Sequence, residues 1–109
     1  MEITAQELVR QIQSVTEEIR LMTARMYEGN IGDGFGMLPK IIDGIGFVAD
    51  QYVLSCGNTE KVVRLNQELS NTNDTIANKD FVLFADIFEY EIISILEEML
   101  KDLQSKYTN

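Results

Sequence analysis

The stretch FVLFADIFEYE, which runs from Phe81 to Glu91, decides the fold of this 109-residue chain. Almost every position up to Phe88 is apolar, so this segment should be covered on several sides. Beyond Glu91 the apolar residues continue at helical spacing, at Ile92, Ile95, Leu96, Met99 and Leu103. A short apolar run could also be a buried strand, but the helical continuation and the lack of any partner strand favour a helix. We predict a helix over residues 79–106.

Three further segments have the same kind of periodicity. Residues 4–28 begin with Thr4 and Glu7 in capping-box spacing. Their apolar stripe consists of Leu8, Ile12, Val15, Ile19, Met22 and Met26. Residues 32–56 have a stripe that consists of Ile31, Phe35, Leu38, Ile42, Ile45, Ala49 and Tyr52. Residues 59–77 have the weakest stripe, which consists of Val62, Leu65, Leu69 and Ile76.

Only short turns separate the four segments, so sequence neighbours should run antiparallel. We therefore predict an all-α fold, an antiparallel up-down-up-down four-helix bundle. At this length the chain suits one domain, over residues 1–109.

Two of the segments contain residues that disfavour a regular helix. Pro39 either kinks the second helix or marks the start of its regular part. Gly44 and Gly46 indicate close approach of a neighbouring helix or a bend, in preference to a role in ligand binding. In the third segment the short polar side chains of residues 71–75 compete for backbone hydrogen bonds. We expect the third helix to fray or break there.

The glycine-rich run GNIGDGFG, residues 29–36, looks at first like a phosphate-binding loop. Such loops follow a strand, whereas a predicted helix precedes this one. The run also lacks the alternating carboxylates of a calcium-binding loop. We predict a turn, in which Gly29 ends the first helix and Asn30 or Asp33 caps the second.

The charge of the chain argues against several classes of partner. It has 18 acidic and 9 basic residues, for a net charge of −9. Cationic side chains supply most of the attraction to phosphate backbones and anionic lipid, so we expect no nucleic-acid and no membrane partner. The sequence has neither a signal-peptide pattern at its start nor an apolar run long enough to span a bilayer. We expect a cytoplasmic protein, in agreement with the lone Cys56, which cannot form an internal disulfide.

No histidine occurs in the sequence. This excludes the Glu-x-x-His pairs of di-metal bundles, Cys/His zinc sites, and Ser-His or Cys-His nucleophile pairs. A metal site made only of carboxylates remains as an alternative. We predict no catalytic residues, no metal ligands and no cofactor.

Glu89 falls inside the apolar arc of the last helix when the residues are projected on a helical wheel. A buried charge is costly unless it has a partner, which we expect to be a backbone group, a tyrosine hydroxyl or one of the arginines Arg20, Arg25 and Arg64. A structural carboxylate is favoured over a general acid or base because no second titratable group converges on it.

Five apolar residues are predicted to face a partner. Leu83, Ile87 and Tyr90 lie on the face of the last helix opposite its main stripe, where a four-helix bundle is normally in contact with water. Phe47 and Leu54 point away from the stripe of the second helix. A loop, a second subunit or a partner protein would cover them.

The stretch NKDFVLFADIFEYEIISILEEM, from Asn78 to Met99, resembles the C-terminal signature of a family of small uncharacterised helical proteins of Firmicutes, typically DYVLLADLLEYELLPLLEEW. MLPKIIDGIGF, from Met37 to Phe47, is similar to that family's LLPxIIDGLxWL segment. The chain departs at Ser94, where the family often has proline, and at Met99, where it often has tryptophan; both changes favour a straighter helix. The resemblance implies a bacterial helical domain of unknown function and no catalytic residues.

The sequence thus predicts a non-enzymatic protein-interaction module, similar in type to a small cytoplasmic chaperone or regulator, which binds a protein partner or associates with itself. The alternative is a ligand- or metal-binding helical bundle.

Overall fold

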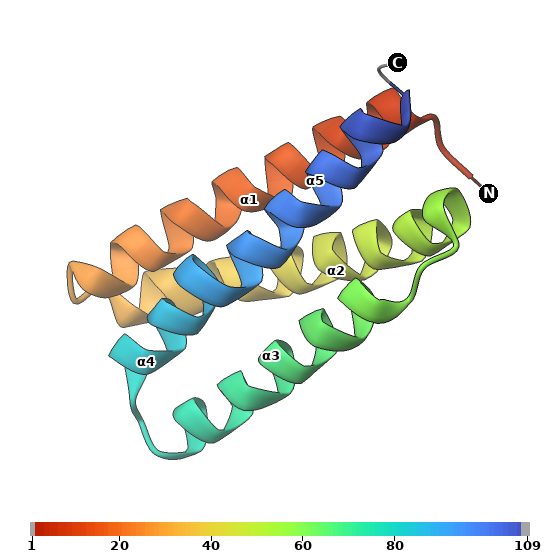
Figure 1. The fold of residues 1–109 in the computed structure, drawn as a ribbon. Coiled ribbons are helices and arrows are strands. Elements are labelled where there is room, and N and C mark those ends of the chain that lie inside the picture. Colours follow the sequence, from red (N-terminus) through yellow and green to blue (C-terminus); the bar gives the residue numbers. More distant parts are fainter. Residues whose placement is uncertain (1, 108–109) are drawn as a thin grey trace.

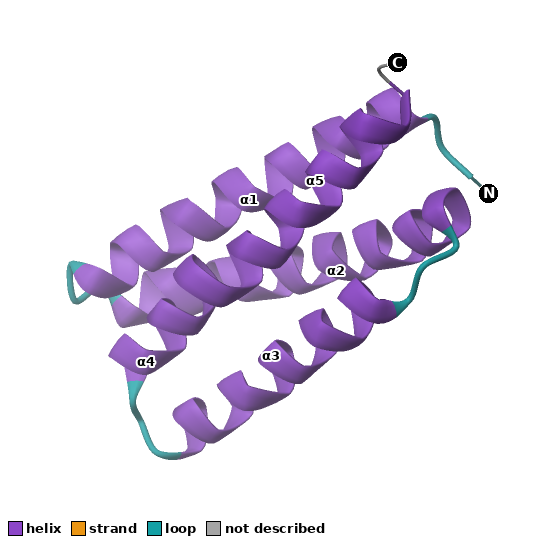
Figure 2. Ribbon diagram, viewed as in Figure 1, coloured by secondary structure: helices purple, strands orange, loops and turns teal. Residues whose placement is uncertain are grey.

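A computed structural model describes residues 2–107, and every regular element in that range is helical (Figures 1 and 2). The elements are α1 (Ala5–Tyr27), α2 (Ile31–Cys56), α3 (Glu60–Ala77), α4 (Phe81–Asp86), η1 (Ile87–Ile92) and α5 (Ile93–Tyr107). Elements α4, η1 and α5 follow one another without a break and are called the C-terminal rod. The rod and the three other helices run antiparallel to their sequence neighbours (Figure 1). This confirms the predicted up-down-up-down four-helix bundle, with each helix end within two residues of its predicted place.

Local hydrogen bonds set where the first two helices begin and end. The Thr4 hydroxyl accepts a hydrogen bond of 3.1 Å from the Glu7 amide, which satisfies one of the free amides of the first turn. Gly29 follows α1 with a φ of 88°, a left-handed conformation that glycine adopts without strain. Asn30 occupies the N-cap position of α2, but its side chain makes no capping hydrogen bond. Asp33, the other predicted cap, lies in the first turn of α2 instead.

Helix α2 buries part of the predicted stripe, including Ile45 and Tyr52, but its closest packing on α1 is shifted from the one predicted. Its buried side includes Gly34, Ile41 and Val48, whereas the predicted Ile42 is 40% exposed. Glycine explains the shift, because a Cβ added at Gly34 would lie 2.6 Å from the Cγ atom of Met26. The helices can therefore approach more closely along the line that contains glycine.

Pro39 is exposed and lies inside α2, which continues on both sides of it. The regular part of the helix therefore begins at Ile31, well before the proline. An exposed position suits proline, since the carbonyl that loses its amide partner can bond to water.

Helix α3 is continuous through residues 71–75, so the prediction that it frays or breaks there is wrong. The Thr72 hydroxyl donates to the Leu69 carbonyl and the Thr75 hydroxyl donates to the Thr72 carbonyl, each at 2.6 Å. Both threonines are buried. Their hydroxyls are satisfied by their own helix, which leaves the methyl groups to pack inward.

The C-terminal rod contains a π-helical segment, η1, where the sequence predicted an uninterrupted α-helix. The buried residues Phe84, Phe88, Ile92 and Leu96 recur at four-residue steps. At 3.6 residues per turn, three such steps drift by about 120° around an α-helix. A π-helical turn holds more residues, as the hydrogen bond from the Ile93 amide to the Phe88 carbonyl shows. The segment therefore keeps all four side chains directed at the core.

A polar network joins three helices where α2 ends. The Tyr52 hydroxyl donates to a carboxylate oxygen of Asp102 at 2.6 Å, and the Lys61 ammonium group donates to the same oxygen. These two hydrogen bonds hold the pKa of Asp102 below its ordinary value. Nearby, Arg64 forms a bidentate pair with Glu98 at 3.0 and 3.2 Å.

Candidate functional site

Two searches for specific kinds of site found nothing in residues 2–107. No group of three or more Cys, Asp or Glu side chains could hold a metal ion. No helix in this range is both long enough and apolar enough to cross a membrane. The described surface does carry an exposed apolar face and an apolar groove.

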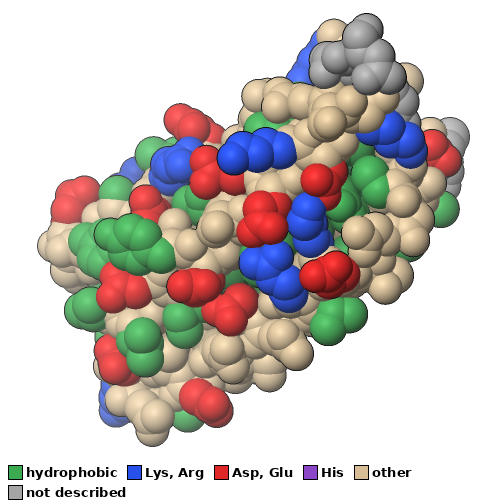
Figure 3. Space-filling model, in the orientation of Figure 1, with side chains coloured by type: hydrophobic (Ala, Val, Ile, Leu, Met, Phe, Trp, Pro, Cys, Tyr) green, Lys and Arg blue, Asp and Glu red, His purple; other side chains and the backbone are tan. Residues whose placement is uncertain are grey.

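The exposed face lies at the end of the bundle where the C-terminal rod begins, and we call it the Tyr90 face. It consists of Leu83, Ile87 and Tyr90 on the rod together with Tyr27 at the end of α1. Tyr90 is 67% exposed, Tyr27 47% and Leu83 46%, while Ile87 is half-buried. Hydrophobic side chains gather on this end of the molecule in Figure 3, with acidic side chains around them.

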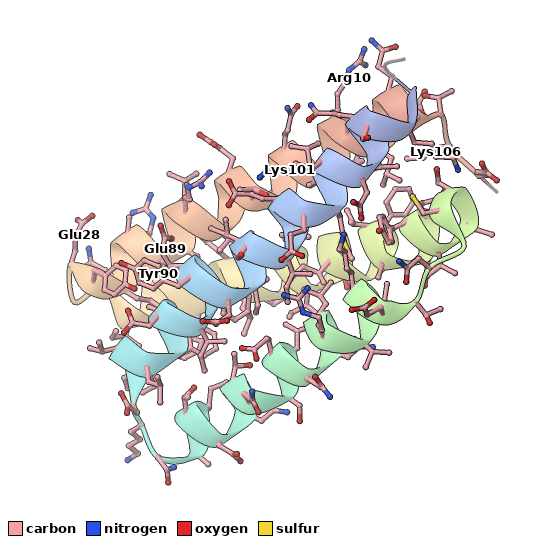
Figure 4. The ribbon with its side chains drawn as sticks, viewed as in Figure 1. Arg10, Glu28, Glu89, Tyr90, Lys101 and Lys106 are labelled. Carbon is pink, nitrogen blue, oxygen red and sulfur yellow. The ribbon has the colours of Figure 1, made fainter. Side chains whose placement is uncertain are left out.

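Two hydrogen bonds hold α1 against the rod beneath this face. The Tyr27 hydroxyl donates to Asp86, and the Thr23 hydroxyl donates to Glu89 at 2.8 Å. Partial burial raises the pKa of the Tyr27 hydroxyl, and so does its hydrogen bond to Asp86. The negative charge of Asp86 raises this pKa further, and Tyr90 and Glu89 act in the same direction, so both lie near Tyr27. In Figure 4, Tyr90 projects from η1 toward the end of α1 where Glu28 lies.

The structure separates the five predicted partner-facing residues into two groups. Leu83, Ile87 and Tyr90 lie together on the Tyr90 face. Phe47 and Leu54 are 42% and 56% exposed on α2, toward the opposite end of the bundle (Figure 1). A single small partner could not readily contact both groups.

Glu89 is half-buried, so the prediction of a buried charge is corrected. Its hydrogen-bond partner is Thr23 and none of the predicted arginines. Arg20 and Arg25 are exposed on α1, and Arg64 pairs with Glu98. Thr23 is 1% exposed and lies directly against η1, so its short side chain reaches the carboxylate without displacing the core.

The groove lies between α2 and α3 and has a volume of about 480 Å³. Apolar and uncharged polar side chains line it, namely Leu38, Ile42, Asn66, Leu69, Ser70, Thr72, Asn73, Ile76 and Phe88. None of these carries a charge. The closest helix packing joins α1 to α2, α1 to the rod and α3 to the rod, so α2 and α3 are the sequence neighbours that approach least closely.

Sequence reasoning missed Tyr27 and the groove. Tyr27 belongs to no apolar stripe, and its bond to Asp86 joins residues 59 positions apart. The polar residues of α3, such as Asn73, did signal the groove in the sequence. We interpreted them instead as a weak point of the helix. They line the groove because they are too small or too polar to fill the space opposite α2.

A family model described as a domain of unknown function (DUF8042) matches residues 4–102. The chain belongs to this family. The matched part of the DUF8042 domain includes all four residues of the Tyr90 face and all nine that line the groove. No curated protein and no solved structure matches the chain.

Proposed function

We propose that this DUF8042 protein is a non-enzymatic interaction module that binds a partner protein through the Tyr90 face. The observation that carries the proposal is the concentration of exposed apolar side chains there, above all Tyr90, which is 67% exposed. Large apolar side chains that cluster on a surface mark interaction sites more often than scattered ones do. Tyrosine is also among the residues that contribute most to binding at the centre of interfaces.

The hydrogen bonds that order the Tyr90 face make it suitable for binding a partner. The hydrogen bonds from Tyr27 to Asp86 and from Thr23 to Glu89 hold two separate elements in one arrangement. A partner would thus meet a surface that is already ordered, which lowers the entropic cost of binding.

The proposal also places the protein in the cytoplasm of a bacterium, where it would act as a small chaperone or regulator. The bacterial origin rests on the family resemblance of the C-terminal signature. Cys56 is a free thiol, as is usual in a reducing compartment.

The test is affinity capture from a bacterial lysate followed by identification and reconstitution. A captured protein is identified by mass spectrometry, purified, and titrated against the wild-type chain and against Tyr90→Ala by calorimetry. We expect Tyr90→Ala to weaken binding about 30-fold, the effect of removing a central interface tyrosine.

Val63→Ala is the matched control, because Val63 is 52% exposed on α3. It should change the dissociation constant less than about twofold. Circular dichroism checks that both variants keep their helices. The proposal is wrong if both variants bind alike, or if no captured protein forms a stoichiometric complex after purification.

A ligand-binding bundle is the second candidate, and the groove between α2 and α3 favours it. Its volume of about 480 Å³ lies within the range of small-molecule sites. Because its lining has apolar and neutral polar groups without a charge, the ligand would be an uncharged, largely apolar molecule.

A further inference from the structure

We infer that the partner of the Tyr90 face is a cationic amphipathic helix, an inference that rests on the proposed function and adds the chemistry of the partner. Two properties of the face lead to it. Its apolar residues follow one helix axis, and the charges around them are predominantly negative.

The apolar residues of the rod have the geometry of a helix-binding surface. Leu83 and Ile87 lie one turn apart along the rod, whereas the π-helical segment places Tyr90 about a quarter-turn away from them, on the side of Tyr27 and α1. The line from Leu83 to Ile87 is about 6 Å long at 1.5 Å per residue. Tyr27 lies beside it on α1, which widens the apolar surface. A second helix with apolar residues at similar spacing can lie along such a line.

Four carboxylates lie near these apolar residues. Asp86 and Glu89 lie between them and α1, as their hydrogen bonds to Tyr27 and Thr23 show. Glu91 is exposed immediately after Tyr90, and Glu28 is exposed at the end of α1. Among the described residues, none of these four carboxylates forms an ion pair with lysine or arginine.

Few cations offset this charge. Residues 81–94 contain no lysine or arginine, Lys79 precedes them, and residues 20–28 contain only Arg20 and Arg25. An apolar stripe bordered by lysine or arginine would complement the face in both respects. A second copy of the chain would instead bring its own carboxylates against these, in a molecule whose net charge is already −9.

The probe for the test is a synthetic helical peptide of about 18 residues, with leucine on one face and lysine on the other. A second peptide replaces every lysine by glutamine. Fluorescence anisotropy measures the binding of each labelled peptide to the wild-type chain. We expect the lysine peptide to bind at least about tenfold more tightly, and its binding to weaken as NaCl rises from about 0.05 to about 0.5 M.

Charge variants distinguish this face from general attraction to an acidic protein. The double variant Glu28→Gln/Glu91→Gln removes two carboxylates beside the Tyr90 face. The control Asp43→Asn/Asp50→Asn removes two exposed carboxylates from α2. We expect the first to weaken lysine-peptide binding about tenfold, from two lost exposed charge pairs, and the control to weaken it less than about twofold. Tyr90→Ala should also weaken it.

Three results would overturn the inference: equal binding of the two peptides, equal effects of the two double variants, or unchanged binding by Tyr90→Ala. The affinity of the captured partner for two variants distinguishes failure of this inference from failure of the proposed function. If Tyr90→Ala loses the partner while Glu28→Gln/Glu91→Gln keeps it with unchanged affinity, the function stands and the cationic helix is wrong. If Tyr90→Ala also keeps it with unchanged affinity, both are wrong.

Discussion

Gly44 and Gly46 show how differently two glycines of one helix can act. A Cβ added at Gly44 would lie 2.7 Å from the Cγ2 atom of Val15, so this glycine allows α1 and α2 to pack closely. No atom lies within 4 Å of the corresponding position at Gly46. The close approach that the sequence interpretation allowed is therefore present at Gly44 and absent at Gly46.

Alanine at these two positions should have opposite effects on stability. Gly46→Ala should raise the free energy of unfolding by about 0.5–1 kcal/mol, because alanine loses less backbone entropy in a helix. Gly44→Ala has the same gain but also drives a methyl group into Val15, whose branched side chain has little rotamer freedom. Overpacking of this kind costs about 1–3 kcal/mol, so the net change should be a loss of about 1 kcal/mol.

Urea unfolding followed by circular dichroism measures both changes. Each glycine variant serves as the other's control, since both lie in α2 and undergo the same substitution. Stabilisation by Gly44→Ala would show that the two helices can move apart at no cost.

At the scale of whole elements, Asp102 links the C-terminal rod to α2 and α3 through Tyr52 and Lys61. Tyr52 is 1% exposed, and its buried hydroxyl donates to this charged acceptor. Burial raises the pKa of Tyr52, and so does its hydrogen bond to Asp102. The hydroxyl therefore stays protonated, as a donor, to a higher pH than that of an ordinary tyrosine.

Asp102→Ala should therefore lower the free energy of unfolding by about 1–3 kcal/mol, the cost of removing the charged acceptor of a buried hydroxyl. Asp102→Asn retains an oxygen for Tyr52 and should cost less. The pKa of Asp102 in the folded protein lies below its ordinary value of 3.8. The carboxylate's contribution is therefore complete above about pH 4 and is lost as the pH falls through the lowered value.

Unfolding in urea at about pH 5 and about pH 2.5 measures this dependence. Between these two pH values, the free energy of unfolding should fall more for the wild type than for Asp102→Asn. Glu17→Gln, on an exposed carboxylate of α1, should behave like the wild type. An Asp102→Asn variant with the same acid sensitivity as the wild type would contradict the role given to this carboxylate.

At the scale of the whole molecule, the bundle is packed unevenly. Helix α1 lies against both α2 and the rod, whereas the space between α2 and α3 remains open as the groove. Ile42 and Ile76, which line it, are each 40% exposed. A larger apolar side chain on α3 should therefore find contacts that the native residues do not make.

Asn73→Leu should raise the free energy of unfolding by about 1 kcal/mol more than Asn71→Leu does. Both changes improve helix propensity, but Asn73 lines the groove and Asn71 does not. The difference corresponds to about 40 Å² of newly buried apolar surface at 25 cal/mol per Å². Thermal and urea unfolding of the two variants measure it.

The same pair tests the second candidate function. If the groove admits neutral apolar molecules, the dye Nile red should fluoresce on binding to the wild type and to Asn71→Leu, and less with Asn73→Leu. Equal stability of the two variants would show that the groove does not shelter a side chain at position 73.

The sequence by itself determined the four helices, their ends and their antiparallel order. These features follow from hydrogen bonds within four residues, from apolar periodicity and from short turns, all of which are local. Tertiary packing decided the register of α2, the π-helical segment, the pairing of Thr23 with Glu89 and the place of Tyr27 beside Tyr90. The two bonds beneath the Tyr90 face join residues 66 and 59 positions apart, so they depend on how whole helices lie against one another. The groove depends on the same packing, because local pattern shows which side of a helix is apolar but not how closely its neighbour approaches.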